Sequence, residues 1–226
     1  MARGRGTSTR ALVLVVSTML AHSACGVPER APGTAVLASG TDLESGNPLV
    51  TIHPLSRQLQ RHALFITLVR LDAQLQPVPY FARSWEWSAD RRRVTFTLAG
   101  ALRWHDGVPT TAHDVHFTFD AARDPALGSP RAGDLQQLDS VVAINDTIVA
   151  LTFRRPLAAL PTVFAELPIV PAHLLDTVPT SRWRTSAFAT APVGNGPFRF
   201  VDRTAGRRWR FARNASFPAE MGGPPR

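Results

Sequence analysis

The stretch LRWHDGVPTTAHDVHFTF, residues 102–119, contains an extended segment, a turn and the start of a helix in immediate succession. Its first half predicts a short extended piece that ends in a turn at Gly107, because Gly and Pro interrupt regular structure. Thr111 and Asp114 have the spacing of a helix N-cap and its third helical residue, and the helix dipole favours an acid there. Apolar residues then recur at i, i+4 and i+7, which predicts a helix with one apolar face: Val115, Phe119 and Ala122.

Three other stretches have two runs containing apolar residues on either side of a polar turn, and in the first of them apolar and polar residues alternate. They are residues 85–98, 138–153 and 198–213. This pattern predicts β-hairpins with one buried face, and in the third of them Trp209 and Phe211 alternate with arginines. The chain is therefore expected to be a mixed α/β protein with antiparallel hairpins.

Four weaker patterns predict further elements. The apolar run at 34–39 is expected to be a buried strand, and Ser56–Val69 a helix with one apolar face. A short apolar helix is expected at Leu157–Leu167, and another is expected to begin at Pro171, since proline is tolerated at the first helical position.

The N-terminus has the three parts of a secretory signal over residues 1–24. Three arginines and no acid are followed by an apolar run at 11–20 and then by small residues. The run is too short for a transmembrane helix, which needs about 20 apolar residues. We therefore expect the rest of the chain to be exported.

Cys25 is the only cysteine and directly follows Ser23 and Ala24. This arrangement resembles a bacterial lipobox, although His22 replaces the usual Leu. The resemblance implies that Cys25 is lipidated and anchors the protein to a membrane, since a single thiol has little use in an oxidising compartment. Cleavage without lipidation is the alternative. Residues 25–33 then form a flexible tether.

Several other functional classes find little support. The net charge of +8 comes from 25 arginines against 17 acids, and such charge alone does not indicate a nucleic-acid partner. His105, His113 and His116 lack the ligand spacing of a metal site, so no metal or cofactor is expected. Motifs of nucleophilic, phosphate-binding or zinc-dependent enzymes do not occur, so we do not expect an enzyme.

The order of these segments resembles the bacterial extracellular solute-binding family 5, the binding subunits of peptide and nickel ABC importers. The matching blocks lie at residues 68–86, 95–119, 191–198 and 213–214. One departure is at 214–217, where only the Asn remains of the Asn-Pro-x-Tyr-Trp-Gly-Gly that usually follows.

The resemblance implies an α/β, periplasmic-binding-protein-like class II fold with two lobes that close over a ligand. Family members are more than twice as long, so residues 34–226 would be the N-terminal portion, with most of the second lobe missing. The expected function is the extracytoplasmic substrate-binding component of an ABC importer for peptides or similar solutes. Its partners would be a short peptide or other small solute and an ABC permease, and the protein would be a monomer. A truncated, non-transporting remnant or membrane-anchored interaction module is the alternative.

Two loops are candidates for ligand contact because the resemblance places them at the cleft. The first, residues 42–48, offers Glu44, Ser45 and Asn47; the alternative is a solvent-exposed connector. The second, residues 193–197, contributes three positions where backbone could approach a ligand closely: Gly194, Asn195 and Gly196. A hinge or a plain turn is the alternative there.

Overall fold

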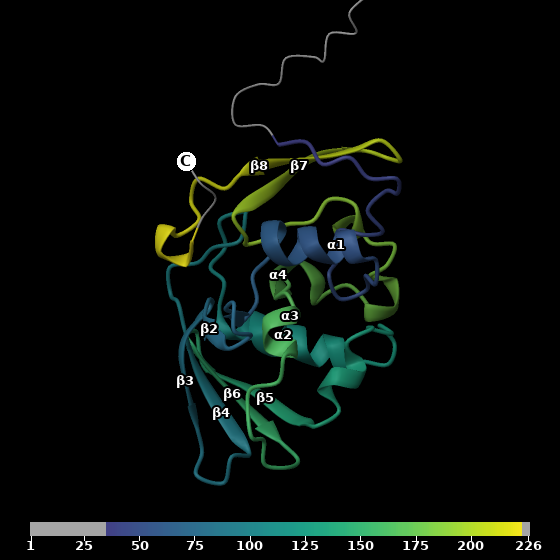
Figure 1. The fold of residues 1–226 in the computed structure, drawn as a ribbon. Coiled ribbons are helices and arrows are strands. Elements are labelled where there is room, and N and C mark those ends of the chain that lie inside the picture. The colour runs from purple at the N-terminus through teal and green to yellow at the C-terminus, as the bar shows by residue number, and fades with distance from the viewer. Residues whose placement is uncertain (1–34, 223–226) are drawn as a thin grey trace, which may run out of the picture. The chain divides into compact units, whose positions relative to one another are not determined.

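The computed structural model describes residues 35–222 (Figure 1). The predicted signal segment, Cys25 and the tether at 25–33 lie outside the described residues. Residues 35–38 belong to a different unit from the fold that begins at Ser39. No helix among residues 35–222 is long and apolar enough to cross a membrane.

A four-stranded antiparallel sheet, with strand order β3-β4-β6-β5, is the largest element of the fold. It is built from two hairpins, which confirms both predictions: β3 (Ala82–Trp87) with β4 (Arg93–Leu98), and β5 (Leu138–Asn145) with β6 (Ile148–Phe153). In β4 the buried residues Val94, Phe96 and Leu98 alternate with more exposed ones, as the period of two requires, whereas bulges shift the register of β3 and β5.

Helix α2 (Ala112–Arg123) packs against β5 and β6, and its start is the predicted one (Figure 1). The Thr111 side chain accepts from the backbone of His113, and the Asp114 carboxylate accepts from the Thr111 N–H at 2.8 Å. This is a capping box, which satisfies N–H groups that a helix start leaves unpaired.

The hydrophobic core lies between the sheet and the helices on one of its faces. Phe96 of β4, Phe119 of α2 and Phe164 of α3 (Val163–Glu166) are all buried, and Phe164 lies edge-on to both other rings, at centroid distances of 5.5 and 5.6 Å. Such pairs add stabilisation beyond the area they bury.

The remaining strands of the described residues form two smaller, two-stranded sheets. β1 (Val69–Leu71) pairs with β2 (Pro77–Pro79), and β7 (Phe198–Thr204) pairs with β8 (Arg208–Arg213), which confirms the third hairpin. In β8 the rings of Trp209 and Phe211 stack on the half-buried face, while arginines alternate with them.

Several predicted elements were wrong in extent or type. Residues 35–39 are irregular and exposed, because no neighbouring strand pairs with them in the described part of the chain. The helix expected at 56–69 instead comprises α1 (Pro54–Leu59) and one π-helical turn, Gln60–Leu64. The helical segment ends at Leu64, because the Phe65 N–H donates to the Gln60 carbonyl and Phe65, the first residue of the buried run that follows, has an extended backbone.

The other helices are short. α3 is far shorter than the expected 157–167, and Pro171 is the N-cap of α4 (Ala172–Leu175), where the sequence predicted the first helical position. Single 3₁₀ turns occur at Ala132–Leu135, Thr180–Arg182, Ala187–Ala189 and Ala219–Met221.

Candidate functional site

The two candidate loops are both fastened to the helical segment Pro54–Leu64. On one side, the Gln60 Nε2 donates to the Ser45 carbonyl at 2.7 Å. On the other, the N–H groups of Asn195 and Gly196 donate to the Leu64 carbonyl at 3.0 and 2.8 Å. Loops that lie about 150 residues apart in sequence are therefore held by one helix, which fixes their relative position.

The polar side chains of the first loop hold the loop itself. The Ser45 Oγ accepts from the Asn47 N–H, and the Asn47 Oδ1 accepts from the Leu49 N–H, both at 3.0 Å. Ser45 and Asn47 are buried, whereas Glu44 is exposed. The Glu44 Oε2 accepts from the N–H groups of Ile52 and His53, at 2.9 and 3.0 Å.

The second loop approaches the helix so closely that glycine is required. A Cβ on Gly194 would lie 1.9 Å from the Leu64 carbonyl oxygen, and one on Gly196 would lie 2.5 Å from the Ala63 carbonyl oxygen. Asn195 between them is fully buried, and its Oδ1 accepts from the Ile66 N–H at 3.0 Å. The close backbone approach expected at these glycines thus occurs within the chain.

His105 fixes the same loop from the other side. Its Nδ1 accepts from the Gly194 N–H at 3.1 Å, and its Nε2 contacts the Gly196 carbonyl at 3.0 Å. This pattern requires a neutral imidazole with its proton on Nε2. Burial lowers the pKa of His105 and so favours that form. The sequence analysis considered His105 only as a metal ligand, which it did not favour, and missed this role.

Asp42 connects the start of the first loop to the β7–β8 hairpin. Its carboxylate accepts from Arg203 and from the Gly206 N–H, each at 3.0 Å, and from the Trp209 Nε1 at 2.7 Å. Burial would raise the pKa of Asp42, but these bonds and one from the Leu43 N–H together lower it to about 2. The sequence gives no signal for this contact, because the partners lie more than 160 residues away.

Two buried amide groups at the site lack partners. The Nδ2 atoms of Asn47 and Asn195 have no hydrogen-bond partner among the described residues. In both side chains the Oδ1 is held by a backbone N–H, so the orientation of each amide is fixed. Each loop therefore contains one amide NH₂ group that is unpaired within the described part of the chain and out of reach of solvent.

Within the described part of the chain, no three His, Cys, Asp or Glu side chains are grouped so that they could hold a metal ion. The His116 Nδ1 instead contacts the Val141 carbonyl at 2.8 Å.

The sequence matches the model of the bacterial extracellular solute-binding proteins, family 5 (middle region), over residues 76–225. A putative ABC transporter peptide-binding protein of Brucella ovis is 30% identical over 220 residues, which are 95% of this chain and 41% of that protein. A probable peptide ABC transporter periplasmic-binding protein of Sinorhizobium fredii is 32% identical, with 81% of this chain and 35% of that protein covered. The chain thus spans well under half the length of these relatives.

Solved structures of binding proteins share the fold. NikZ from Campylobacter jejuni, in complex with Ni(L-His), superposes with a TM-score of 0.69 at 27% identity, over 78% of this chain and 34% of that one. The oligopeptide-binding protein AppA from Bacillus subtilis, in complex with a nonapeptide, has a TM-score of 0.71 at 21% identity, over 78% and 35%. The fold is that of about a third of a class II periplasmic binding protein. On the strength of the family match and the shared fold, the chain belongs to the bacterial extracellular solute-binding proteins of family 5.

Proposed function

We propose that the chain serves as, or is part of, the extracytoplasmic substrate-binding component of an ABC importer for peptides or similar solutes. Family membership carries this proposal, and the relatives from Brucella ovis and Sinorhizobium fredii are named as peptide-binding proteins of such transporters. In this function the protein makes and breaks no bond: it captures the solute and presents it to a membrane permease.

The solute would bind at the two loops that the Pro54–Leu64 segment holds. Ser45, Asn47, Gly194, Asn195 and Gly196 would act mainly by fixing the shape of the loops, because most of their polar groups already bond to the chain.

Glu44 would contribute charge to this site. It is exposed, and both of its hydrogen bonds use the Oε2 atom, so the Oε1 has no partner among the described residues. A carboxylate oxygen in this position suits the N-terminal ammonium of a peptide, since hydrogen bonds between charged groups are about twice as strong as neutral ones.

Calorimetric titration with short peptides tests the proposal. Saturable binding is expected, and Glu44→Gln should weaken it severalfold, while retaining the acceptor for the Ile52 and His53 N–H groups. N-acetylated peptides should bind both forms equally. Glu86→Gln, an exposed change in β3, is the control that leaves affinity unchanged. Absence of binding across a broad peptide panel would contradict the function, and hydrolysis of a peptide would indicate an enzyme.

Export and lipidation at Cys25 complete the proposal. The support is the basic and apolar N-terminus followed by small residues and a single cysteine. Intact-mass measurement of the protein from its own cells tests this: acyl chains on a polypeptide that begins at Cys25 are expected, whereas an unmodified cysteine would refute the anchor.

A further inference from the structure

His105 holds the second loop through its backbone as well as through both ring nitrogens. Its N–H donates to the Gly194 carbonyl at 2.7 Å, while its Nδ1 accepts from the Gly194 N–H. Its Nε2 donates to the Gly196 carbonyl, which also accepts from the Asn214 Nδ2 at 3.1 Å. The closed loop therefore requires a ring without a proton on Nδ1.

Protonation of the ring would turn the Nδ1 acceptor into a second donor. The Nδ1–H and the Gly194 N–H would then point at each other, and the buried Gly194 N–H would lose its partner. Little room exists for a small adjustment, because a Cβ on Gly194 would lie 1.9 Å from the Leu64 carbonyl oxygen and 3.0 Å from the His105 Cε1. Relief requires the ring and Gly194 to separate.

The groups around His105 favour its neutral form, but the ring is partly exposed, so a proton can reach it. Burial is the largest influence on the pKa of His105 and lowers it, and the charge of Arg199 on β7 lowers it further. The Gly196 carbonyl and the Asp106 carboxylate act in the opposite direction. Asp106 also pairs with His173 of α4 at 2.7 Å.

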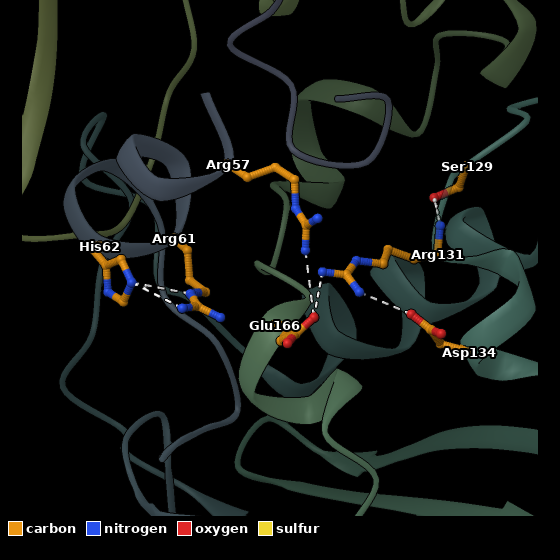
Figure 2. Close-up of polar contacts among 7 residues, drawn as sticks. All are labelled: Arg57, Arg61, His62, Ser129, Arg131, Asp134 and Glu166. Atoms are coloured by element: carbon orange, nitrogen blue, oxygen red, sulfur yellow. Dashed lines mark hydrogen bonds and ion pairs between the residues drawn. The ribbon is translucent and has the colours of Figure 1, made fainter. Parts of the chain in front are cut away.

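The helical segment on the other side of the loop is fixed to the core (Figure 2). Arg57 of α1 pairs with Glu166 of α3 at 3.5 Å, and Arg131 pairs with the same carboxylate and with Asp134. Between about pH 5 and pH 8 histidine is the side chain that ordinarily changes its charge, so this network should hold the segment in place. A change at His105 would therefore move the loop and not the segment.

The stretch just before the second loop touches the first loop. The Gly46 N–H donates to the Ala189 carbonyl at 2.6 Å, and a Cβ on Gly46 would lie 2.7 Å from the Pro192 ring. Pro192 precedes Gly194 by two residues. A displacement of Gly194 can therefore reach the first loop through Pro192.

We propose that His105 is a proton-sensitive switch of the candidate site. When its ring is protonated, Gly194 separates from it and the two loops lose the arrangement that binds solute. His105 is thus a positioning residue, and acid weakens solute binding. The effect on solute rests on the proposed function, whereas the release of the loop does not.

Nuclear magnetic resonance of the purified chain without solute tests the release. The ring signals of His105 report its protonation, and hydrogen exchange of the Gly194, Asn195 and Gly196 amides, corrected for the intrinsic effect of pH, reports loop closure. Protection should fall about tenfold as the ring gains its proton, with the same midpoint, because a buried donor loses its partner. Unchanged protection beside a charged ring, or a ring that stays neutral down to about pH 5, would overturn the proposal.

Variants assign the effect to His105. His105→Asn keeps an acceptor near the Nδ1 position but cannot gain a proton, so its loop should stay protected throughout the titration. His62→Gln, which alters the contact with Arg61 on the helical segment, and His173→Gln, which alters the pair with Asp106, should keep the pH dependence. Loss of the dependence in either control would overturn the proposal. If His105→Asn does not fold, the two midpoints of the unaltered chain decide.

Calorimetric titration with short peptides at about pH 8 and pH 5 separates this inference from the proposed function. The unaltered chain should bind about tenfold more weakly at the lower pH, and His105→Asn equally at both. Binding at neither pH would contradict the proposed function, while the exchange measurement would still decide whether the loop is released. Loop release with unchanged affinity would overturn the control of solute binding by His105.

Discussion

Replacing Gly194 with alanine should destabilise the protein by about 3 kcal/mol. The new Cβ would lie 1.9 Å from the Leu64 carbonyl oxygen, whereas real Cβ contacts are not shorter than 3.0 Å, so the loop must move by more than 1 Å. The obstacle is backbone and cannot rotate away. This movement would break the bonds of the loop to Leu64 and His105, at about 1 kcal/mol each. Overpacking in other cores costs about 1–3 kcal/mol, which agrees with this magnitude.

Urea denaturation and thermal unfolding measure the effect. A loss of about 3 kcal/mol corresponds to a fall of roughly 6–12 °C in Tm for a domain of this size. Gly133→Ala is the matched control: nothing lies within 4 Å of its Cβ position, and its φ is not positive. It should be neutral or stabilising by about 0.4–1 kcal/mol, because alanine reduces the freedom of the unfolded chain. Equal stability of Gly194→Ala and Gly133→Ala would refute the reasoning.

Three further predictions concern single contacts. Asp42 has a folded-state pKa of about 2 against a usual 3.8, so it should contribute stability above pH 4 that is lost as the pH falls towards 2. Asp42→Asn should flatten this part of the profile of unfolding free energy against pH. An unchanged profile would show that Asp42 does not stabilise the fold in this way. Burial lowers the pKa of His105, so the stability that its neutral ring contributes is present above the unfolded value of 6.5 and is lost as the pH falls below it. ¹⁵N spectra of the ring should show the proton on Nε2, because Nδ1 accepts from the Gly194 N–H. A proton on Nδ1 would contradict this arrangement. Thr111→Ala should cost about 1 kcal/mol in chemical denaturation, because it removes a helix cap, whereas Thr97→Ala on an exposed strand position should cost less.

The elements that were predictable from sequence are those specified by local pattern. The hairpin at 85–98 follows from its alternation of apolar and polar residues, the hairpin at 138–153 from its Asn-Asp turn between two apolar runs, and α2 from its capping box and apolar face. Ser56–Val69 was predicted poorly because its second half, a run of apolar residues buried on all sides, fits a helix and an extended segment equally well.

The contacts that shape the candidate site join residues too distant to be inferred from pattern. Ile66 bonds to Asn195 across 129 positions, and Trp209 bonds to Asp42 across 167. Similarly, Arg91 ties its turn to the Leu157 carbonyl, 66 residues away, where the sequence shows only a basic turn. Glycine at 194 and 196 signalled a close backbone approach, but the residue approached could not be read from the sequence.

The unpaired amides of Asn47 and Asn195 show what it costs to hold the two loops rigid. Asn47 and Asn195 each use Oδ1 to satisfy a backbone N–H, and this fixes where Nδ2 points. An exposed amide would bond to water through its Nδ2, whereas these two are out of reach of solvent and have no such partner. Folding thus bears a cost of about 1–3 kcal/mol for each unpaired donor, and the hydrogen bonds that each Oδ1 and its loop make must offset this cost.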